Sequence, residues 1–592
     1  MTSLKLKTIT LKRKTKKFLS SFGLGRFFKT NKGDLDKKLV YSLSPRKIPN
    51  GRQFKHLSKY LNPKEYLIVK ICIILILVNV VYLGIMFVKK HLEYIPVAGG
   101  TYVEGVIGYP KTINPIYSSN RDIDGDLSRL IYSSLFTYNA NGELVKDLAT
   151  DLKVEAEGKE YIIRIHDNAY WHNGEKLTAD DIIFTFNLIK DEEYRSPLRH
   201  SLLGVRAEMI DEQTLKFVLS ETYAPFPELL TFGILPQRIW ENIDSNAAVL
   251  SELNLKPVGS GPYKFKTLIK NRNGYLKDYN LVVNEEYYRE KPYLKNITFR
   301  FFVNYPEAIE ALNDNQVDAL SYLPLIERKE LLAQNSLFLH ELSLPQIVSV
   351  FFNGTKNEKL AEKKIRQALA MAIDKDKLLT DAYDDIYKRA DSPVLENSFA
   401  YKEDVNKTLY NKEEAKKLLG ENALEISLSV VDVNGNVSFA EKLKKYWEEI
   451  GVKVNLKTVP SNQASETIKN RDFEVLIYGQ NLGGDPDIYA FWHSSQANAK
   501  GLNLASYNNE DVDKLLVEAR RSLNEEDRIT KYKQIQEKIV SDMSVIFLYS
   551  PTYTYVQSKK TKGFVGTAIV EPADRWASVS SWYKRTKKKL VW

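Results

Sequence analysis

One long apolar run constrains this 592-residue chain more than any other feature. Residues 66–88 read YLIVKICIILILVNVVYLGIMFV, and Lys70 is their only charge. At about 1.5 Å per residue, a helix of this length reaches the ~30 Å hydrocarbon thickness of a bilayer. Lys70 is near one end, where its amine can extend to the interface. The run is longer than the apolar core of a secretory signal peptide, and no small-residue cleavage motif follows it. The sequence therefore predicts an uncleaved transmembrane helix over residues 66–88.

The distribution of charge predicts the orientation of this helix. Residues 1–65 hold 18 Lys or Arg and 3 Asp or Glu, a balance of +15, although the whole chain carries only +10. Because a basic flank stays on the cytoplasmic side, we expect 1–65 to be a basic cytoplasmic leader. The expected location is the cytoplasmic membrane, with a single span and a large extracytoplasmic domain. The rest of the chain sums to −5, so we expect no nucleic acid partner. A short basic cluster at 584–589 is predicted to be a solvated tail.

Residue counts and motifs argue against several functional classes. Cys72 is the only cysteine and lies inside the apolar run, which excludes an intramolecular disulfide and cysteine-based zinc or Fe–S sites. The sequence contains no HExxH, GxSxG, P-loop or GxGxxG motif. Of the seven histidines, only His166 and His172 are close in sequence, and metal ligation is the less common role of such a pair. We predict no enzymatic activity, no metal and no cofactor.

Helix and strand patterns alternate in the body of the chain. Residues 411–420 (NKEEAKKLLG) combine an N-cap Asn, a Glu at the third helical position and a terminal Gly. Residues 439–450 form an apolar helical face that ends at Gly451, and an alternating strand follows at 452–456. Residues 473–478 (FEVLIY) are typical of a buried strand. This alternation predicts an α/β fold.

Short motifs follow one another over about residues 99–570. They are INP at 113–115, WHNGEKLTADDI at 171–182, GSGPY at 259–263, IRQAL at 365–369, AID at 372–374 and DPD at 485–487. In this order and spacing the chain resembles the bacterial extracellular solute-binding proteins of ABC transporters, family 5, the oligopeptide/dipeptide/nickel-binding class. The segment 171–182 is the most specific part of the match.

The resemblance implies an α/β periplasmic-binding-protein fold of class II, the large oligopeptide-binding type, with two lobes that enclose the solute between them. It divides the chain into a leader (1–65), a transmembrane helix (66–88), the first part of lobe I (99–344), lobe II (345–548), and a lobe I closing segment with a basic tail (549–592). The lipid-modified cysteine common in the family is absent, because Cys72 lacks the usual small residues before it. The transmembrane helix takes the place of that lipid.

The function implied by the resemblance is capture of a peptide or peptide-like solute and its delivery to an ABC permease and its ATPase. A ligand-sensing or scaffolding ectodomain with the same fold and no transport role is the alternative. Neighbouring permease and ATPase reading frames would favour the transport role.

Candidate solute-binding residues are expected at turns and strand ends that face the cleft. They are Tyr109, Asn114, Phe352, Asn353, Tyr478, Gln480, Asn481, Asp485 and Trp492. Phe352 and Asn353 are expected where the chain crosses to the second lobe. Family members that bind peptides often have an acidic residue in the loop after the 473–478 strand, where it pairs with the amino terminus of the ligand. The matching position here is Leu482, and nearby Asp485 has an equally good role in capping the turn before Pro486.

Overall fold

The computed structural model describes residues 61–117, 122–332, 334–420, 424–433 and 435–591. The chain divides into two compact units: Tyr94–Lys587, and Met1–Glu93 together with Lys588–Trp592. Nearly all of the predicted leader lies outside the described residues.

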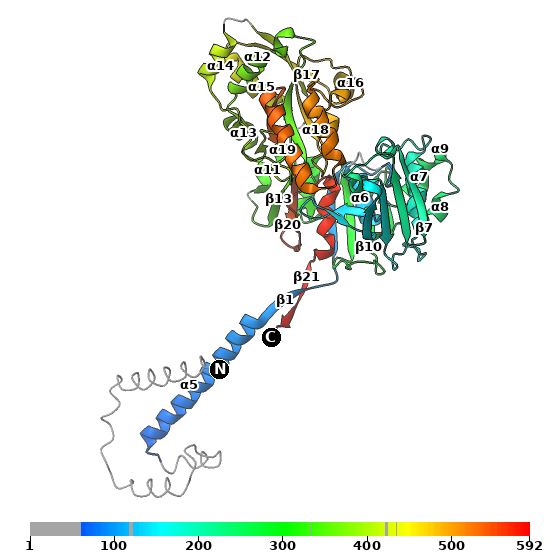
Figure 1. Ribbon diagram of the computed structural model, residues 1–592. Coiled ribbons are helices and arrows are strands. Elements are labelled where there is room, and N and C mark those ends of the chain that lie inside the picture. Colours follow the sequence, from blue (N-terminus) through cyan, green and yellow to red (C-terminus); the bar gives the residue numbers. More distant parts are fainter. Residues whose placement is uncertain (1–60, 118–121, 333, 421–423, 434, 592) are drawn as a thin grey trace, which may run out of the picture. The chain divides into compact units, whose positions relative to one another are not determined.

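Helix α5 (Pro63–His91) contains the whole predicted span (Figure 1). Pro63 occupies its first turn, and the Asn62 backbone N–H donates to Glu65 Oε2 over 3.1 Å, which are both start signals for a helix. None of its residues is buried, and its most apolar 18-residue window has a mean hydropathy of 2.9. The helix is therefore long and apolar enough to cross a membrane, a property that an N-terminal signal sequence shares.

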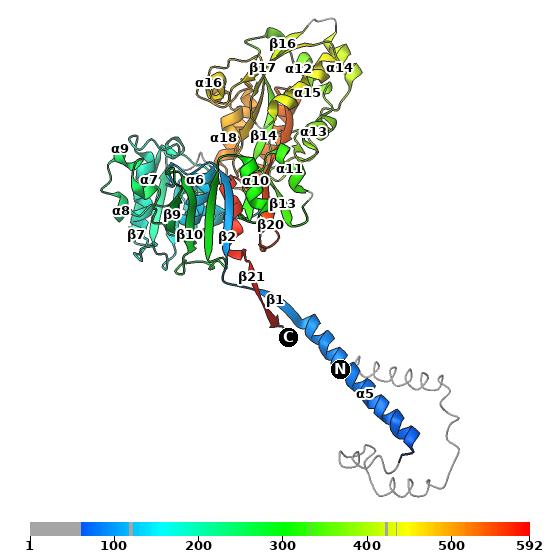
Figure 2. The same cartoon turned by 180° about the vertical axis from the view of Figure 1, so that it is seen from behind.

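A seven-stranded sheet brings together strands from both ends of the chain (Figure 2). Its order is β13 (Leu337–Ser343), β20 (Thr552–Ser558), β12 (Ala319–Leu320), β2 (Thr101–Ile107), β11 (Asn296–Phe302), β10 (Leu276–Val283) and β9 (Tyr263–Lys270). Strand β2 runs parallel to both of its neighbours. A Cβ at Gly105 would lie 2.6 Å from Leu320 Cδ2 and 3.2 Å from the Ala319 carbonyl oxygen, so glycine allows β2 and β12 to approach closely without displacing these atoms. We call residues 94–343 and 552–587 the outer part.

The outer part also holds a smaller sheet and a hairpin. The four-stranded sheet has the order β5 (Ala149–Glu155), β6 (Glu160–Ile165), β8 (Thr214–Leu219), β7 (Val205–Asp211), and β3 (Phe136–Tyr138) pairs with β4 (Leu144–Lys146). Its helices are α6 (Asp122–Ile131), α7 (Ala179–Lys190), α8 (Gln237–Trp240), α9 (Ser245–Ala248), α10 (Tyr305–Asn313) and α11 (Leu325–Leu332). Its 3₁₀ helices are η3 (Ala156–Gly158), η4 (Arg199–Leu202), η5 (Phe226–Leu230), η6 (Glu252–Asn254) and η9 (Pro572–Ser581).

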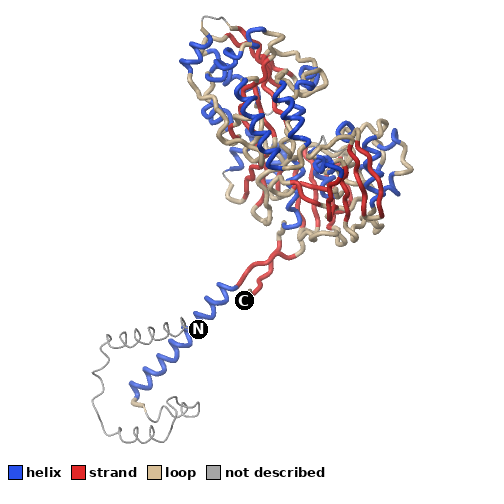
Figure 3. The backbone as a smooth tube through the Cα atoms, viewed as in Figure 1, coloured by secondary structure: helices blue, strands red, loops and turns tan. Residues whose placement is uncertain are grey.

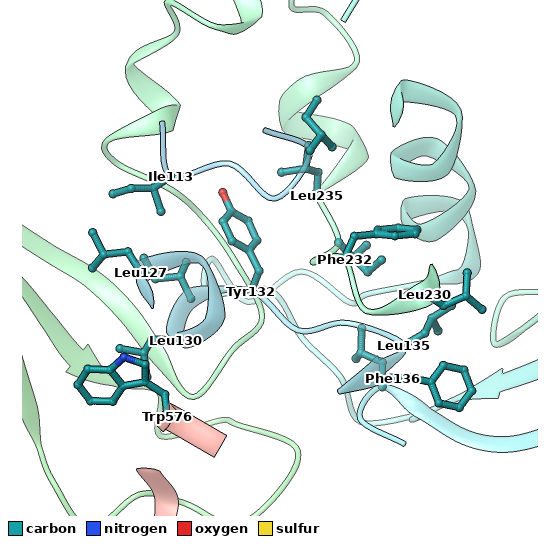
Figure 4. Packing of buried hydrophobic residues seen from close by; sticks show 14 of the residues in the cluster. Ile113, Leu127, Leu130, Tyr132, Leu135, Phe136, Leu230, Phe232, Leu235 and Trp576 are labelled. Carbon is teal, nitrogen blue, oxygen red and sulfur yellow. The ribbon is translucent and has the colours of Figure 1, made fainter. Parts of the chain in front are cut away.

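The core of the outer part joins segments that are far apart in sequence. Figure 4 shows Leu130 of α6 and Trp576 of η9 in one cluster of buried hydrophobic residues. Beside them Arg575 is completely buried, pairs with Asp126, and places its Nη2 3.1 Å from Glu104 Oε1. This buried arginine, with its two carboxylate partners, connects the C-terminal segment to strand β2, which contains Glu104.

A six-stranded sheet forms the core of residues 346–550, which we call the inserted part. Its order is β15 (Lys388–Arg389), β19 (Val545–Ser550), β14 (Gln346–Phe352), β18 (Val475–Asn481), β16 (Glu425–Val431) and β17 (Lys453–Val459). The helices are α12 (Lys363–Met371), α13 (Lys375–Tyr383), α14 (Lys412–Leu419), α15 (Asn436–Glu448), α16 (Ala464–Lys469), α17 (Tyr489–Trp492), α18 (Glu510–Arg521) and α19 (Glu525–Asp542), with η7 (Glu358–Ala361) and η8 (Ser494–Gln496).

The elements expected in this part from local patterns are confirmed. In α14 the Asn411 side chain accepts the N–H of Glu414 over 3.0 Å, and Gly420 follows with a φ of 65°. Helix α15 buries Phe439, Leu443 and Trp447. The two predicted strands are β17 and β18. The described chain thus has the mixed α/β composition that the alternation predicted.

Two short crossings link the outer and inserted parts. Strand β13 continues into β14 through Leu344 and Pro345, and β19 continues into β20 through Pro551. Because β19 ends at Ser550, Tyr549 and Ser550 belong to the inserted sheet, and the predicted closing segment 549–592 begins two residues too early.

The basic C-terminal segment is a strand rather than a simple solvated tail. Strand β21 (Arg585–Leu590) pairs with β1 (Leu92–Val97), and Figure 3 draws both in the strand colour. All six residues of β21 are exposed, as expected for a basic surface segment. The preceding Lys584 places its Nζ 2.7 Å from Asp318 Oδ1, so this lysine is paired.

Candidate functional site

A cavity of about 750 Å³ lies between the outer and inserted parts. From the outer part it is lined by residues 141–145, Glu228 and residues 568–570. From the inserted part it is lined by residues 394, 395, 397–399, 482–486 and 488, and Glu525, and Pro345 of the first crossing completes the wall. Its volume and its position between two parts of the chain are typical of a small-molecule binding site.

The loop after β18 forms one wall of this cavity. The Leu482 N–H donates to the Pro345 carbonyl over 2.7 Å, which fixes the loop to the crossing. Gly483 has a φ of 80°, a conformation that glycine adopts without strain. A Cβ at Gly484 would lie 2.7 Å from Tyr138 Cε1, so glycine lets this loop approach the outer part closely. At the position where an amine-binding acid is expected, the apolar side chain of Leu482 lines the cavity instead.

Asp485 lies in this wall, but its carboxylate is already paired. It forms an ion pair with Arg528 of α19, and both side chains are nearly buried. Burial raises the pKa of the Asp485 carboxyl, and the positive charge of Arg528 opposes this rise. The pair therefore satisfies its own charges within the wall of the cavity.

Glu228 of η5 faces this loop from the outer part. Its Oε2 accepts the backbone N–H of Asp485 over 2.9 Å, and its carboxylate also hydrogen-bonds the Tyr138 hydroxyl. Burial, followed by the nearby charge of Asp485, raises the pKa of Glu228 to about 7. Among the described ion pairs, none involves Glu228. The cavity wall therefore holds a carboxylate without an ion pair among the described residues, although the charge of Arg528 acts on it from a longer distance.

A second set of contacts joins the two parts beside the cavity. The Arg520 guanidinium of α18 lies between two rings, with its Cζ 4.9 Å from the Tyr223 ring centroid and 4.2 Å from that of Tyr489. Arg520 Nη2 also donates to Asp487 Oδ2 over 2.9 Å. The backbone N–H of Ala224 donates to the Arg520 carbonyl over 2.8 Å. Arg520 is therefore a principal contact between the inserted part and the outer part.

Of the nine predicted solute-binding residues, Asp485 is the one that lines this cavity. Tyr478 is half-buried against the core of the inserted part. Gln480 Nε2 donates to the Leu502 carbonyl over 2.9 Å, and Asn481 Oδ1 accepts the Gly483 N–H over 3.1 Å. These three side chains make their contacts within the inserted part.

The structure corrects the expected position of Phe352 and Asn353. In the antiparallel pairing of β14 with β18, Gln346 at the crossing lies opposite Asn481, whereas Phe352 lies opposite Val475 at the far end. Phe352 is buried, and Asn353 Nδ2 donates to the Arg471 carbonyl over 3.1 Å. The chain crosses at Pro345, seven residues before Phe352, so the prediction that both residues lie at the crossing is wrong.

Trp492, Asn114 and Tyr109 also lie apart from the cavity wall. Trp492 is buried and packs against Phe547, with ring centroids 5.9 Å apart, so it belongs to the core of the inserted part. Asn114 is fully buried, and its Nδ2 donates to Asn254 Oδ1 over 3.1 Å. Tyr109 is exposed. Trp492 therefore serves packing and Asn114 serves turn geometry, which their residue types alone did not indicate.

Sequence reasoning missed Glu228 and the segments 141–145 and 397–399. The one local signal for Glu228 is an acid within the apolar stretch APFPELL, where an unpaired charge is unusual. Among the residues that the structure describes, no group of three or more His, Cys, Asp and Glu side chains is arranged to hold a metal ion.

Comparison with known proteins agrees with this arrangement. Residues 143–501 match the family described as "Bacterial extracellular solute-binding proteins, family 5 Middle". The oligopeptide-binding protein AppA of Bacillus subtilis (strain 168) is 29% identical over 499 residues, which cover 79% of this chain and 89% of the relative.

Solved structures share the fold. The ABC transporter substrate binding protein CtaP from Listeria monocytogenes has a TM-score of 0.74 and 26% identity, over 82% of this chain and 100% of that chain. The structure of AppA from Bacillus subtilis in complex with a nonapeptide has a TM-score of 0.65 and 26% identity, over 83% of this chain and 99% of that chain. The family match spans more than half of the sequence and the fold is that of the oligopeptide-binding proteins, so this chain belongs to the family 5 extracellular solute-binding proteins of ABC transporters, a non-enzymatic family.

Proposed function

We propose that this chain is a membrane-anchored, extracytoplasmic protein that captures a peptide or peptide-like solute between two lobes and delivers it to an ABC permease. The observation that carries the proposal is the cavity of about 750 Å³ between the outer and inserted parts. The peptide class is supported by two similar proteins, an oligopeptide-binding protein and its complex with a nonapeptide.

The two lobes of this proposal are the predicted residues 99–344 with 549–592, and residues 345–548, with the last boundary moved from residue 549 to the crossing at Pro551. Two crossings, at Pro345 and Pro551, are the points about which they would move. Hinge closure around a solute excludes water and creates a surface that a permease with its ATPase can recognise. The contacts of Arg520 and Glu228 between the outer and inserted parts are those that closure would form.

In this proposal α5 anchors the protein in the membrane, and the N-terminus of the chain lies in the cytoplasm. Its support is an apolar helix with a strongly basic preceding segment and no cleavage motif. Peptide mapping of the protein from native membranes, together with carbonate extraction, tests it. We expect peptides from residues 1–60 in the carbonate-resistant protein. A mature N-terminus after residue 91 would instead make α5 a signal sequence.

Native mass spectrometry of the full chain, purified in detergent from its own cells, tests the solute class. We expect co-purified peptides that are released on denaturation. Recovery of sugars or metals alone would contradict the peptide proposal.

Uptake of labelled peptide by cells with and without the gene tests delivery to a permease. Loss of uptake in the deletion strain is expected for a transport subunit. Unchanged uptake would favour the ligand-sensing or scaffolding role instead.

A further inference from the structure

The charges that line the cavity are all of one sign. Four acidic residues, Glu143, Glu228, Asp485 and Glu525, contribute to its wall, and none of the described lining residues is Lys, Arg or His. A cavity with this lining is complementary to a solute that carries positive charge. The inference drawn from it rests on the proposed function, because it names the chemistry of the solute that the same cavity takes.

Three of the four acids have other means of stabilisation. Asp485 is paired with Arg528. Glu143 is exposed and accepts the Asn139 Nδ2–H over 2.8 Å. Glu525 is exposed in the first turn of α19, where the helix dipole favours a negative charge. Glu228 differs from them because it is largely shielded from solvent and has no basic partner among the described residues.

The surroundings of Glu228 leave it accessible from the cavity. Its Oε2 accepts the Asp485 N–H over 2.9 Å, and a carboxylate has further lone pairs that can accept hydrogen bonds. A Cβ at Gly484 would lie 3.0 Å from Glu228 Oε1 and 2.8 Å from the Tyr138 hydroxyl oxygen, so the glycine leaves room beside both atoms. The glycine of the loop and the acid of the outer part therefore form one recess in the wall.

We infer that the Glu228 carboxylate binds an ammonium group of the solute. Glu228 is half-buried and has no ion pair among the described residues, so a charge-assisted hydrogen bond from an ammonium group would stabilise its charge. Leu482 occupies the position of the acid expected on the inserted loop, so the outer part supplies the negative charge from the opposite wall. The raised pKa of Glu228 agrees with a site that lacks its cation.

An ammonium group can come from a peptide amino terminus or from a lysine side chain. Three synthetic nonapeptide pools of mixed sequence separate these sources: an unblocked pool without basic residues, an N-acetylated pool with one lysine, and an N-acetylated pool without basic residues. Equilibrium dialysis against the full chain in detergent micelles gives the affinity of each pool.

We expect at least one ammonium-bearing pool to bind tenfold or more tightly than the neutral pool. Glu228→Gln should reduce this preference to twofold or less, whereas Glu228→Asp should retain most of it. Glu192→Gln removes the same charge from an exposed position outside the cavity wall and should keep the wild-type preference. Whichever pool shows the preference identifies the source of the ammonium group.

Equal binding of all three pools by the wild-type protein would overturn the inference and leave peptide capture intact, and this measurement does not depend on any variant folding. An undiminished preference in a folded Glu228→Gln protein, judged by its thermal unfolding, would overturn it as well. Failure of all three pools to bind would instead contradict the peptide proposal itself, together with the inference that rests on it.

Discussion

The backbone amide of Asp485 donates a 2.9 Å hydrogen bond to the carboxylate of Glu228, and this contact joins the inserted part to the outer part at the wall of the cavity. Asp485 is neutralised by Arg528, whereas Glu228 has the Tyr138 hydroxyl and this amide as its partners. The two neighbouring carboxyl groups therefore differ in how their charge is stabilised, and this difference has consequences for solute binding.

Affinity for an ammonium-bearing solute should rise with pH. Burial and the Asp485 charge raise the pKa of Glu228 to about 7, while Tyr138 and Arg528 act in the opposite direction. Below pH 7 the carboxyl group is protonated and cannot pair with a cation. Between pH 5.5 and 8 we expect affinity to increase by about 20- to 30-fold, with proton release on binding near pH 7. Calorimetric titration in buffers of different ionisation enthalpy measures both quantities. A flat profile in the wild-type protein, or an equal rise in Glu228→Gln, would contradict this prediction.

Replacement of Arg520 by Ala should weaken solute binding. The guanidinium stacks on Tyr223 of the outer part and on Tyr489 of the inserted part, and desolvated contacts of this kind contribute on the order of 1–2 kcal/mol. We expect a loss of about tenfold in affinity for the co-purified solute, measured by equilibrium dialysis.

Arg521 provides the matched control. It also pairs across the two parts, with Glu221, but both side chains are more than half exposed. Because exposed ion pairs contribute little, Arg521→Ala should change affinity by about twofold or less. Equal losses of affinity in Arg520→Ala and Arg521→Ala would show that the stacking of Arg520 on the two tyrosine rings does not contribute to solute binding.

Arg575→Leu should destabilise the protein, and more strongly at high pH. Arg575 is completely buried between Glu104 and Asp126, so its removal leaves two buried carboxylates without a cation at a cost of about 3–5 kcal/mol. Burial already raises the pKa of Glu104 to about 7, and Arg575 opposes this rise. Without Arg575 the folded state holds its protons more tightly than the unfolded state does, so stability should fall as pH rises from 5.5 to 8.

Denaturant unfolding of the full chain in detergent at both pH values measures this effect. Arg164→Ala removes an exposed pair with Asp167 and should cost less than about 1 kcal/mol at either pH. If Arg575→Leu lowered the free energy of unfolding more at pH 5.5 than at pH 8, the proposed pairing of Arg575 with the charged Glu104 and Asp126 would be refuted.

Gly259→Ala should prevent normal folding of the outer part. A Cβ at Gly259 would lie 2.0 Å from the Ile131 carbonyl oxygen, a backbone atom that cannot move away independently. Gly274 has a positive φ of 84°, but a Cβ there would meet nothing within 4 Å. We therefore expect Gly274→Ala to cost about 1 kcal/mol from backbone strain alone, and Gly259→Ala several times more. Expression yield and denaturant midpoint compare the two variants, and similar stabilities would contradict the steric explanation.

Local patterns in the sequence were sufficient for several elements of this fold. The apolar run 66–88 predicts α5, and the caps at Asn411 and Gly420 predict α14 almost to the residue. These features are local, because the hydrogen bonds and side-chain faces that define them involve residues within a few positions of one another. The order and spacing of short motifs over about residues 99–570 indicated the family, and these motifs can also be read directly from the sequence.

The cavity wall depended on the tertiary structure. Phe352 and Asn353 lie at the far end of β14 because of the antiparallel register with β18, and a register cannot be read from one strand alone. Glu228 faces the loop at Asp485 although 257 residues separate them in the chain. By itself the sequence determined an apolar helix long enough to cross a membrane, the α/β elements and the family, since each rests on local pattern or ordered motifs. Which acid lines the cavity without an ion pair was decided by the packing of the inserted part on the outer part, because burial and ion pairing are properties of three-dimensional neighbours.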